Sequence, residues 1–169
     1  FAAETVNIRQ HIHANPELSF QEFQTSEYVK NTLKSYGLEA ENMAGTGLVV
    51  VLKGRNPEKK VIALRADLDA LPIFEKNDVA YKSKIEGVMH ACGHDVHTAS
   101  LLGTARILNQ LKEEFEGTVK LIFQPGEEKF PGGASLMTKE GVLQNPAPEA
   151  ILGQHVFPLL ETGKVGFRS

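Results

Sequence analysis

The densest group of chemically active side chains lies in one short segment. Three histidines, a cysteine and an aspartate occur together there: His90, Cys92, His94, Asp95 and His97. A thiolate and imidazoles suit zinc, cobalt, nickel or manganese-like ions. The spacing is not that of a zinc finger, and no second cysteine exists to close a structural site. Two alternatives stay open: a cysteine nucleophile paired with a histidine base, and a buried free cysteine beside structural histidines.

Two aspartates follow a different apolar segment. Asp67 and Asp69 come shortly after Val61–Leu64. They share one face if the strand continues, because side chains in a strand alternate with a period of two. Carboxylates that lie close together repel unless a cation or a proton lies beside them. The pair therefore indicates a cation site, and the alternative is an acidic turn in solvent.

Two glutamates and a further histidine also follow apolar segments. Glu127 and Glu128 come after Thr118–Phe123 and a Pro-Gly turn, which predicts a place at the edge of a sheet rather than on a solvated helix face. One carboxylate could then face a metal while its neighbour faces a water molecule. His155 follows Ala150–Gly153. A single histidine there is more often structural, so only the other clusters favour it as a ligand.

The elements that position these clusters follow from the apolar pattern. Short, continuous apolar runs separated by helical segments predict strands of a buried sheet with helices packed outside, which is an α/β fold. The predicted strands are Gly47–Leu52, Val61–Leu64, Thr118–Phe123 and Ala150–Gly153. Such sheets place ligand sites at the carboxyl ends of their strands. The clusters are therefore expected to converge on one metal site, which two ions could share.

Helices are predicted between these strands. Residues Ala2–His13 form the first, and apolar residues at helical spacing predict another over Thr98–Leu111. Ser19 and Glu22 have the spacing of a capping box, which predicts a helix that begins at Ser19 and ends near Gly37.

Composition and charge exclude several classes of protein. With 41% hydrophobic and 23% charged residues in 169 positions, the chain is typical of one soluble globular domain. A net charge of −3 is too small, and of the wrong sign, for a nucleic-acid or anionic-membrane partner. No apolar run approaches the length that crosses a bilayer. The single cysteine excludes an internal disulfide and fits a reducing compartment, so we expect a cytoplasmic protein.

Five segments, in this order, resemble the M20 metallopeptidase superfamily, in the branch of N-acyl-amino-acid amidohydrolases, hippurate hydrolases and auxin-conjugate hydrolases. They are His13–Ser19, Arg65–Pro72, Met89–Asp95, Phe123–Glu128 and Gly153–His155. The Met-His-Ala-Cys-Gly-His-Asp string is highly specific, whereas the Glu-Glu pair alone is weak. The resemblance covers nearly the whole chain and implies a metal-dependent hydrolase of N-acyl amino acids or related small peptide-like substrates.

Roles for individual residues come from this resemblance. It implies four metal ligands: Cys92, His94, Glu128 and His155. Glu127 would be the general base that takes a proton from metal-activated water. Asp69 falls where the superfamily has an aspartate that orients a metal-site residue, and Asp67 stands where other branches carry a ligand histidine. Two divalent ions are implied, manganese or zinc first, with cobalt and nickel as alternatives.

The resemblance also implies a domain organisation. Residues 1–169 would be the N-terminal portion of a zinc-exopeptidase-like catalytic domain with a mixed, mostly parallel sheet flanked by helices. The lid domain, through which the full-length protein would form a homodimer, and the C-terminal part with a last histidine ligand would lie outside this chain. The isolated fragment would then have little or no activity. Its partner would be a small N-acyl amino acid, with no nucleic acid and no membrane.

Two other function classes compete with this interpretation. A cysteine hydrolase would pair Cys92 with His90, His94 or His97. A non-catalytic metal- or ligand-binding module is the second alternative. Glu127 argues against that module, because a pure binding site has no use for a base.

Overall fold

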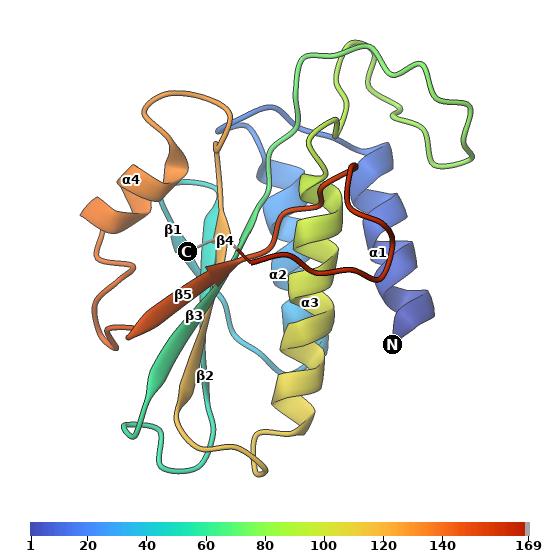
Figure 1. Ribbon diagram of the computed structural model, residues 1–169. Coiled ribbons are helices and arrows are strands. Elements are labelled where there is room, and N and C mark those ends of the chain that lie inside the picture. Colours follow the sequence, from blue (N-terminus) through green and yellow to red (C-terminus); the bar gives the residue numbers. More distant parts are fainter. Residues whose placement is uncertain (168–169) are drawn as a thin grey trace.

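The computed structural model describes residues 1–167 as a five-stranded mixed sheet with helices on both faces (Figure 1). The strands are β1 (Glu41–Met43), β2 (Gly47–Lys53), β3 (Val61–Asp67), β4 (Thr118–Gln124) and β5 (Ala150–Gly153), in the spatial order β1-β2-β4-β3-β5. β3 pairs in parallel with β4 and β5, whereas β2 runs antiparallel to β1 and β4. Every strand except β2 therefore points the same way, which confirms the predicted α/β fold and its mostly parallel sheet.

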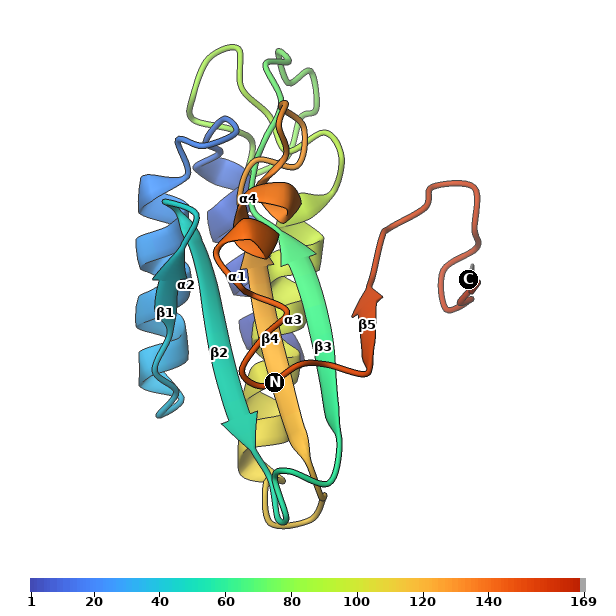
Figure 2. The same ribbon diagram turned by 90° about the vertical axis from the view of Figure 1, so that its left-hand side faces the viewer.

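The helices are divided unequally between the two faces of the sheet. Figure 2 shows α1, α2 and α3 together behind the sheet and α4 alone in front of it. Their bounds are α1 (Ala2–Ala14), α2 (Phe23–Ser35), α3 (His94–Gln110) and α4 (Gly133–Lys139). α3 packs on β3 and β4, and α1 packs on α3. α3 lies on the face of the sheet that carries three helices, and it begins beside the carboxyl ends of the parallel strands.

The main core fills the space between the sheet and α1–α3. Leu33, Leu102, Leu121 and Phe123 are fully buried in it. β4 is buried along its whole length because β2 and β3 flank it and helices cover both of its faces. This placement explains why its sequence is a continuous apolar run rather than an alternating one.

β5 is a strand, as predicted, but it is not buried. All four of its residues are exposed, and Ile151 and Leu152 each expose about half of their surface. The reason is its place at the edge of the sheet, where it pairs with β3 alone. An apolar run predicts a strand, and only the order of the strands decides whether that strand is covered.

The predicted capping box at the start of α2 is wrong. The helix begins at Phe23 and has no side-chain hydrogen bond at its cap. Ser19 instead donates to Asp69 Oδ2 at 2.6 Å, and Glu22 accepts a hydrogen bond from Thr46 Oγ1 at 2.6 Å. Both side chains are buried, so their polar atoms need partners within the fold, and these partners replace the local cap.

The helix predicted over Thr98–Leu111 begins earlier than its apolar pattern indicates. α3 starts at His94, which places His94 and His97 in its first turn. Two short elements, β1 and α4, were not predicted; α4 covers its face of the sheet through the buried Met137. Residues 168–169, at the end of the segment where the lid was expected to follow, lie outside the described residues. Within residues 1–167, no helix is both long and apolar enough to cross a membrane.

Candidate metal centre

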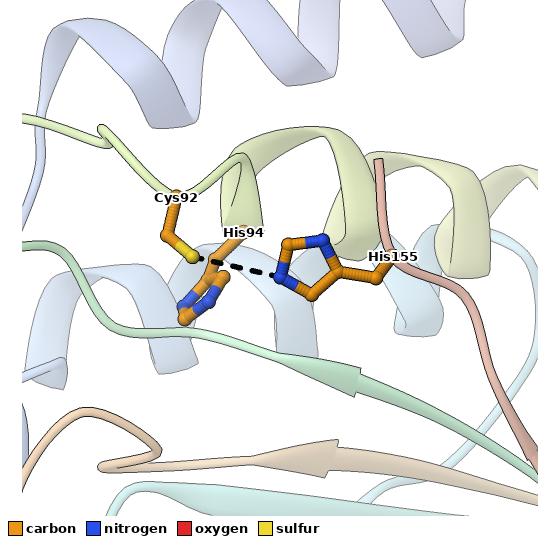
Figure 3. A group of neighbouring side chains, drawn as sticks. All are labelled: Cys92, His94 and His155. Atoms are coloured by element: carbon orange, nitrogen blue, oxygen red, sulfur yellow. Dashed lines mark hydrogen bonds between the residues drawn. The ribbon is translucent and has the colours of Figure 1, made fainter. Parts of the chain in front are cut away.

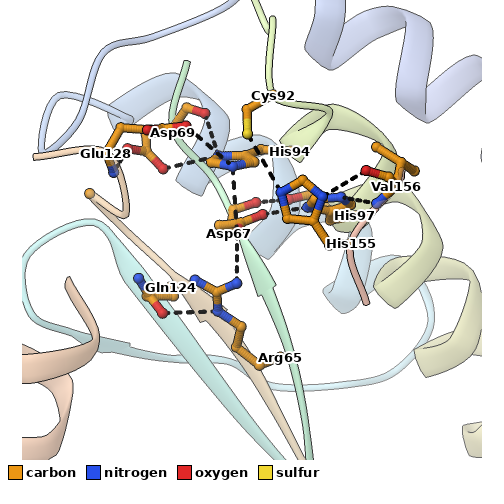
Figure 4. Close-up of polar contacts among 12 residues, drawn as sticks. Arg65, Asp67, Asp69, Cys92, His94, His97, Gln124, Glu128, His155 and Val156 are labelled. Atoms are coloured by element: carbon orange, nitrogen blue, oxygen red, sulfur yellow. Dashed lines mark hydrogen bonds and ion pairs between the residues drawn. The ribbon is translucent and has the colours of Figure 1, made fainter. Parts of the chain in front are cut away.

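The predicted site residues converge where the parallel strands end (Figure 4). β3 ends at Asp67, β4 leads into Glu127 and Glu128, β5 leads into His155, and α3 begins at His94. The structure brings together three overlapping sets whose ligand atoms lie within 4.8 Å of one another: Cys92, His94 and His155; Asp67, His94 and His97; His94, Glu127 and Glu128. His94 belongs to all three sets and is therefore the centre of the cluster.

The orientation of His94 leaves one ring nitrogen free for a ligand. Its Nδ1 lies 2.9 Å from the backbone oxygen of Asp69, and because a carbonyl can only accept, Nδ1 carries the hydrogen. Its Nε2 lies 3.6 Å from Asp67 Oδ2 and 3.8 Å from Glu128 Oε1. This nitrogen is buried and has no hydrogen-bond partner among residues 1–167. A cation beside the two carboxylates would satisfy it, and the arrangement matches that of metal-binding histidines.

His155 shows the same division of its two ring nitrogens. Its Nδ1 lies 2.7 Å from the backbone oxygen of Val156, so the hydrogen again lies on Nδ1. Its Nε2 points toward Cys92 and lies 3.5 Å from Cys92 Sγ (Figure 3). These two imidazoles and the sulfur atom have possible ligand atoms within 4.8 Å of one another, and this donor set suits zinc and related divalent ions.

Asp69 connects three segments of the candidate site through hydrogen bonds. Its carboxylate accepts from Ser19 Oγ at 2.6 Å and from the backbone N–H of Glu128 at 2.9 Å, and it lies 3.2 Å from His94 Nδ1. Burial would raise the pKa of Asp69, but these hydrogen bonds outweigh burial and hold the pKa well below its ordinary value. Asp69 is only 1% exposed, which rules out the alternative of an acidic turn in solvent.

Asp67 is equally buried, and both of its oxygens are engaged (Figure 4). Oδ1 lies 2.7 Å from His97 Nδ1, and Oδ2 accepts from Arg65 Nη1 at 2.6 Å. Burial would raise the pKa of Asp67, but the hydrogen bond of His97 and the charge of Arg65 lower it below its ordinary value. The sequence analysis missed the partner role of Arg65, although alternation along β3 places both side chains on one face.

Cys92 is a thiol in this environment rather than an activated nucleophile. Burial and the neighbouring Glu128 carboxylate raise the pKa of Cys92 to about 11. Catalytic cysteines need the opposite, an electropositive setting that stabilises the thiolate. A bound cation would provide that setting and would make the sulfur a ligand. His90, one of the bases considered for it, is neutral because burial lowers its pKa to about 4.

The turn that leads into the glutamate pair is held from the N-terminal part of the chain. Glu22 is fully buried and accepts a hydrogen bond at 2.7 Å from the backbone N–H of Gly126. Gly126 has a φ of +52°, and a Cβ there would lie 2.3 Å from the ring of Phe20. The position therefore requires glycine. Glu22 thus fixes the residue that precedes Glu127, a role that its capping-box spacing did not reveal.

A second buried polar cluster is centred on Asp95, the residue that follows His94. Asp95 Oδ2 accepts from Arg9 Nε at 2.7 Å and lies 2.8 Å from His13 Nδ1. His13 Nε2 in turn lies 3.0 Å from Glu75 Oε1. These contacts connect α1 and the loop that contains Glu75 to the first turn of α3. His94 is therefore followed in the sequence by a residue that is held from two other parts of the fold.

Comparison with known proteins identifies the family of this chain. Residues 63–169 match the model of peptidase family M20/M25/M40, so the chain belongs to this family. It is 48% identical to an N-acyl-L-amino acid amidohydrolase of Geobacillus stearothermophilus over 94% of this chain and 42% of that protein. It is 44% identical to an N-acetylcysteine deacetylase of Bacillus subtilis over 99% of this chain and 44% of that protein.

A solved structure agrees with the fold. The Bacillus subtilis YXEP protein, described as a dinuclear metal-binding peptidase of the M20 family, superposes with a TM-score of 0.92 at 43% identity. The superposition covers 98% of this chain and 46% of that protein. The chain thus spans less than half the length of the relatives that it matches.

Proposed function

We propose that this chain contributes the metal-binding part of a hydrolase that cleaves the amide bond of N-acyl amino acids or related small peptide-like substrates. The observation that carries the proposal is the free, buried Nε2 of His94, which faces two carboxylates and lies in reach of a thiol and a second imidazole. What distinguishes this nitrogen is that it faces two carboxylates, so that a cation between them would satisfy all three groups.

Four residues would hold two divalent ions: Cys92, His94, Glu128 and His155. This donor set favours manganese or zinc, and it also suits cobalt or nickel. Ions bound there would lower the pKa of a water molecule and polarise the scissile carbonyl. The relative of known structure that is described as dinuclear supports the number of two.

Glu127 is proposed as the general base. A carboxylate oxygen of Glu127 lies within 4.8 Å of a ring nitrogen of His94 and of a carboxylate oxygen of Glu128. Glu127 is exposed to solvent. From there one carboxylate oxygen would accept a proton from the attacking water and later donate it to the leaving amine. Asp69 is proposed to orient the site, because it contacts both the ring of His94 and the backbone of Glu128.

The substrate class and the rest of the protein are inferred from the relatives. Their names describe N-acyl amino acids as substrates, and the small negative charge of this chain gives no reason to expect a nucleic-acid or membrane partner. Because the chain spans less than half of their length, we propose that it is the N-terminal portion of the catalytic domain. The complete protein would add a further histidine ligand and a lid domain that forms a homodimer. A single cysteine supports a cytoplasmic location.

The competing cysteine hydrolase is disfavoured by the surroundings of Cys92. A nucleophilic thiolate at neutral pH needs a lowered pKa, whereas burial and Glu128 raise the pKa of this thiol. The two mechanisms also differ in their inhibitors. Chelation would stop the metal hydrolase, and alkylation of the thiol alone would stop the cysteine hydrolase.

The decisive experiment is hydrolysis of N-acetyl and N-benzoyl amino acids by the complete protein. It is run with added Mn²⁺ or Zn²⁺, after chelation, and after restoration of the metal. We expect release of free amino acid that disappears on chelation and returns with the metal. Activity that survives chelation but is lost when Cys92 is alkylated would overturn the proposal in favour of the cysteine hydrolase.

A further inference from the structure

We infer that His97 is a positioning residue that sets the place of His155. The inference rests on the proposed metal centre and goes beyond it, since His97 is not among the proposed ligands. His97 is 1% exposed, and it lies in the first turn of α3. Both of its ring nitrogens make short contacts, one with the end of β3 and one with the segment after β5.

The hydrogen bonds of His97 fix its tautomer. The backbone N–H of Val156 donates to His97 Nε2 at 2.9 Å, so that nitrogen must carry a lone pair. His97 Nδ1 therefore carries the hydrogen and donates it to Asp67 Oδ1 at 2.7 Å. Arg65 donates to Asp67 and fixes its carboxylate. The His97 imidazole is therefore held at the end of β3 through Nδ1, and its Nε2 is left to accept from Val156.

Val156 transmits this constraint to the proposed ligand. Its N–H is held by His97, while its C=O accepts from His155 Nδ1 at 2.7 Å. The rings of His97 and His155 also contact edge to face, with centroids 4.6 Å apart. His155 is exposed and follows an exposed edge strand, so no core packing fixes it. The hydrogen-bonded path Asp67–His97–Val156–His155 supplies the fixed geometry that a ligand requires.

The backbone conformation at Gly93 allows the start of α3 and the segment after β5 to lie close together. Gly93 precedes α3 with a φ of +86°, and a Cβ there would lie 2.3 Å from Val156 Cγ2. Only glycine allows Val156 to lie against the start of α3 in this way. The segment after β5 is therefore seated on the turn between Cys92 and His94, and His97 is the buried side chain that ties it there.

A nearby contact provides a matched control. Ser100 Oγ donates to Gln154 Oε1 at 3.0 Å, and this exposed hydrogen bond also joins α3 to the segment after β5. It touches neither Val156 nor Asp67. Ser100→Ala thus removes a tie between the same two elements without removing the path to His155.

The test is a titration of the metal-free complete protein with Co²⁺, whose visible absorption reports imidazole and thiolate ligands. His97→Asn keeps a donor toward Asp67 but cannot reach Val156, and we expect Co²⁺ affinity to fall about 10- to 100-fold with an altered spectrum. His97→Gln places an amide oxygen near the position of Nε2, so it should lose less affinity than His97→Asn. Ser100→Ala should bind Co²⁺ as the wild type does. Wild-type affinity in His97→Asn would overturn the inference.

Two measurements that need no metal keep the inference testable if a variant does not fold. Nitrogen-15 spectra of the wild-type protein should show the His97 proton on Nδ1, and hydrogen exchange should show a protected Val156 amide. Protection of that amide should be lost in His97→Gln less than in His97→Asn. A proton on Nε2 or an unprotected Val156 amide would overturn the tie. A wild-type protein that bound no Co²⁺ would instead overturn the proposed centre, while these two readouts would still decide the role of His97.

Discussion

The two halves of the candidate metal centre differ in how they are held. The inner half consists of Asp67, Asp69 and His94, each 1% exposed and hydrogen-bonded to another segment of the fold. The outer half consists of Cys92, Glu127, Glu128 and His155, which are half-buried or exposed. Buried polar groups must find partners within the protein, whereas exposed groups are satisfied by water. The fold therefore dictates the orientation of the inner half, and the outer half stays accessible to solvent and substrate.

This difference separates two kinds of mutational effect. Changes to the inner half and to the residues that hold it should alter stability and metal affinity. Changes to the outer half that leave its ligands in place should alter turnover and little else. A loss of stability from an exposed outer residue, or a loss of turnover alone from a buried inner residue, would contradict this division.

The largest expected effect belongs to Glu127. Glu127→Gln keeps the shape of the side chain but removes its ability to accept a proton, so turnover should fall about 100- to 10,000-fold. Metal content and the free energy of unfolding should remain those of the wild type, because the side chain is exposed. Steady-state kinetics and metal analysis provide the test, with the exposed Glu58→Gln as control. Full activity in Glu127→Gln would show that the base is a different residue.

Glu22 should show the opposite behaviour. Its buried carboxylate accepts hydrogen bonds from Thr46 and from the backbone of Gly126, and Glu22→Gln replaces the charged acceptor by a neutral amide that keeps only one accepting atom. The free energy of unfolding should fall by about 1.5–3 kcal/mol, the range for hydrogen bonds to charged groups. Urea denaturation followed by circular dichroism measures this loss. Glu27→Gln, an exposed change on α2, should leave the stability unaltered. Equal losses in both variants would show that the hydrogen bonds of Glu22 do not stabilise the fold.

Asp69→Asn tests whether the inner half controls the metal. The amide keeps the size of the carboxylate but loses the charge and one acceptor that serve Ser19, His94 and the backbone of Glu128. Metal affinity should fall about 10- to 100-fold, as is typical when the partners of ligand residues are changed. Competition with a chromophoric chelator measures the affinity. Asp78→Asn, at an exposed position, serves as the control, and unchanged affinity in Asp69→Asn would remove Asp69 from the site.

The smallest expected effect is a pH dependence of stability that arises from His13 and its contacts with Asp95 and Glu75. The hydrogen bond to Asp95 and that to Glu75 raise the pKa of His13 above its ordinary value of 6.5, although burial opposes them. A raised pKa in the folded state stabilises the fold fully below the unfolded pKa, and this contribution is lost as the pH rises through the folded pKa. The free energy of unfolding of the metal-free protein should therefore decline as the pH rises above about 6.5.

His13→Asn should make that decline shallower. The control is His11→Asn, which removes a histidine of the same helix whose pKa is lowered by burial and should leave the decline in place. Urea unfolding at a series of pH values compares the three proteins. An identical slope in wild type and His13→Asn would show that the contacts with Asp95 and Glu75 do not stabilise the charged imidazole.

Local pattern was sufficient for much of the fold. The apolar runs predicted all four of the longer strands within a few residues, although β5 is exposed at the edge of the sheet. Pattern failed where tertiary partners compete with local ones. Ser19 and Glu22 have the spacing of a cap, but Asp69, Thr46 and Gly126 offer them buried hydrogen bonds instead.

The residue types of the candidate site can be read from the sequence alone. The residue types that can bind a metal and accept a proton were identifiable because they follow the ends of strands, where an α/β sheet gathers them. Which of these groups have a hydrogen-bond partner depends on the fold. His94 and His97 are residues of the same type in one helical turn, yet within residues 1–167 His94 Nε2 has no hydrogen-bond partner, whereas His97 bonds through both nitrogens. The reason is physical: a side chain's type is local, but its hydrogen-bond partners come from segments that only the fold brings near.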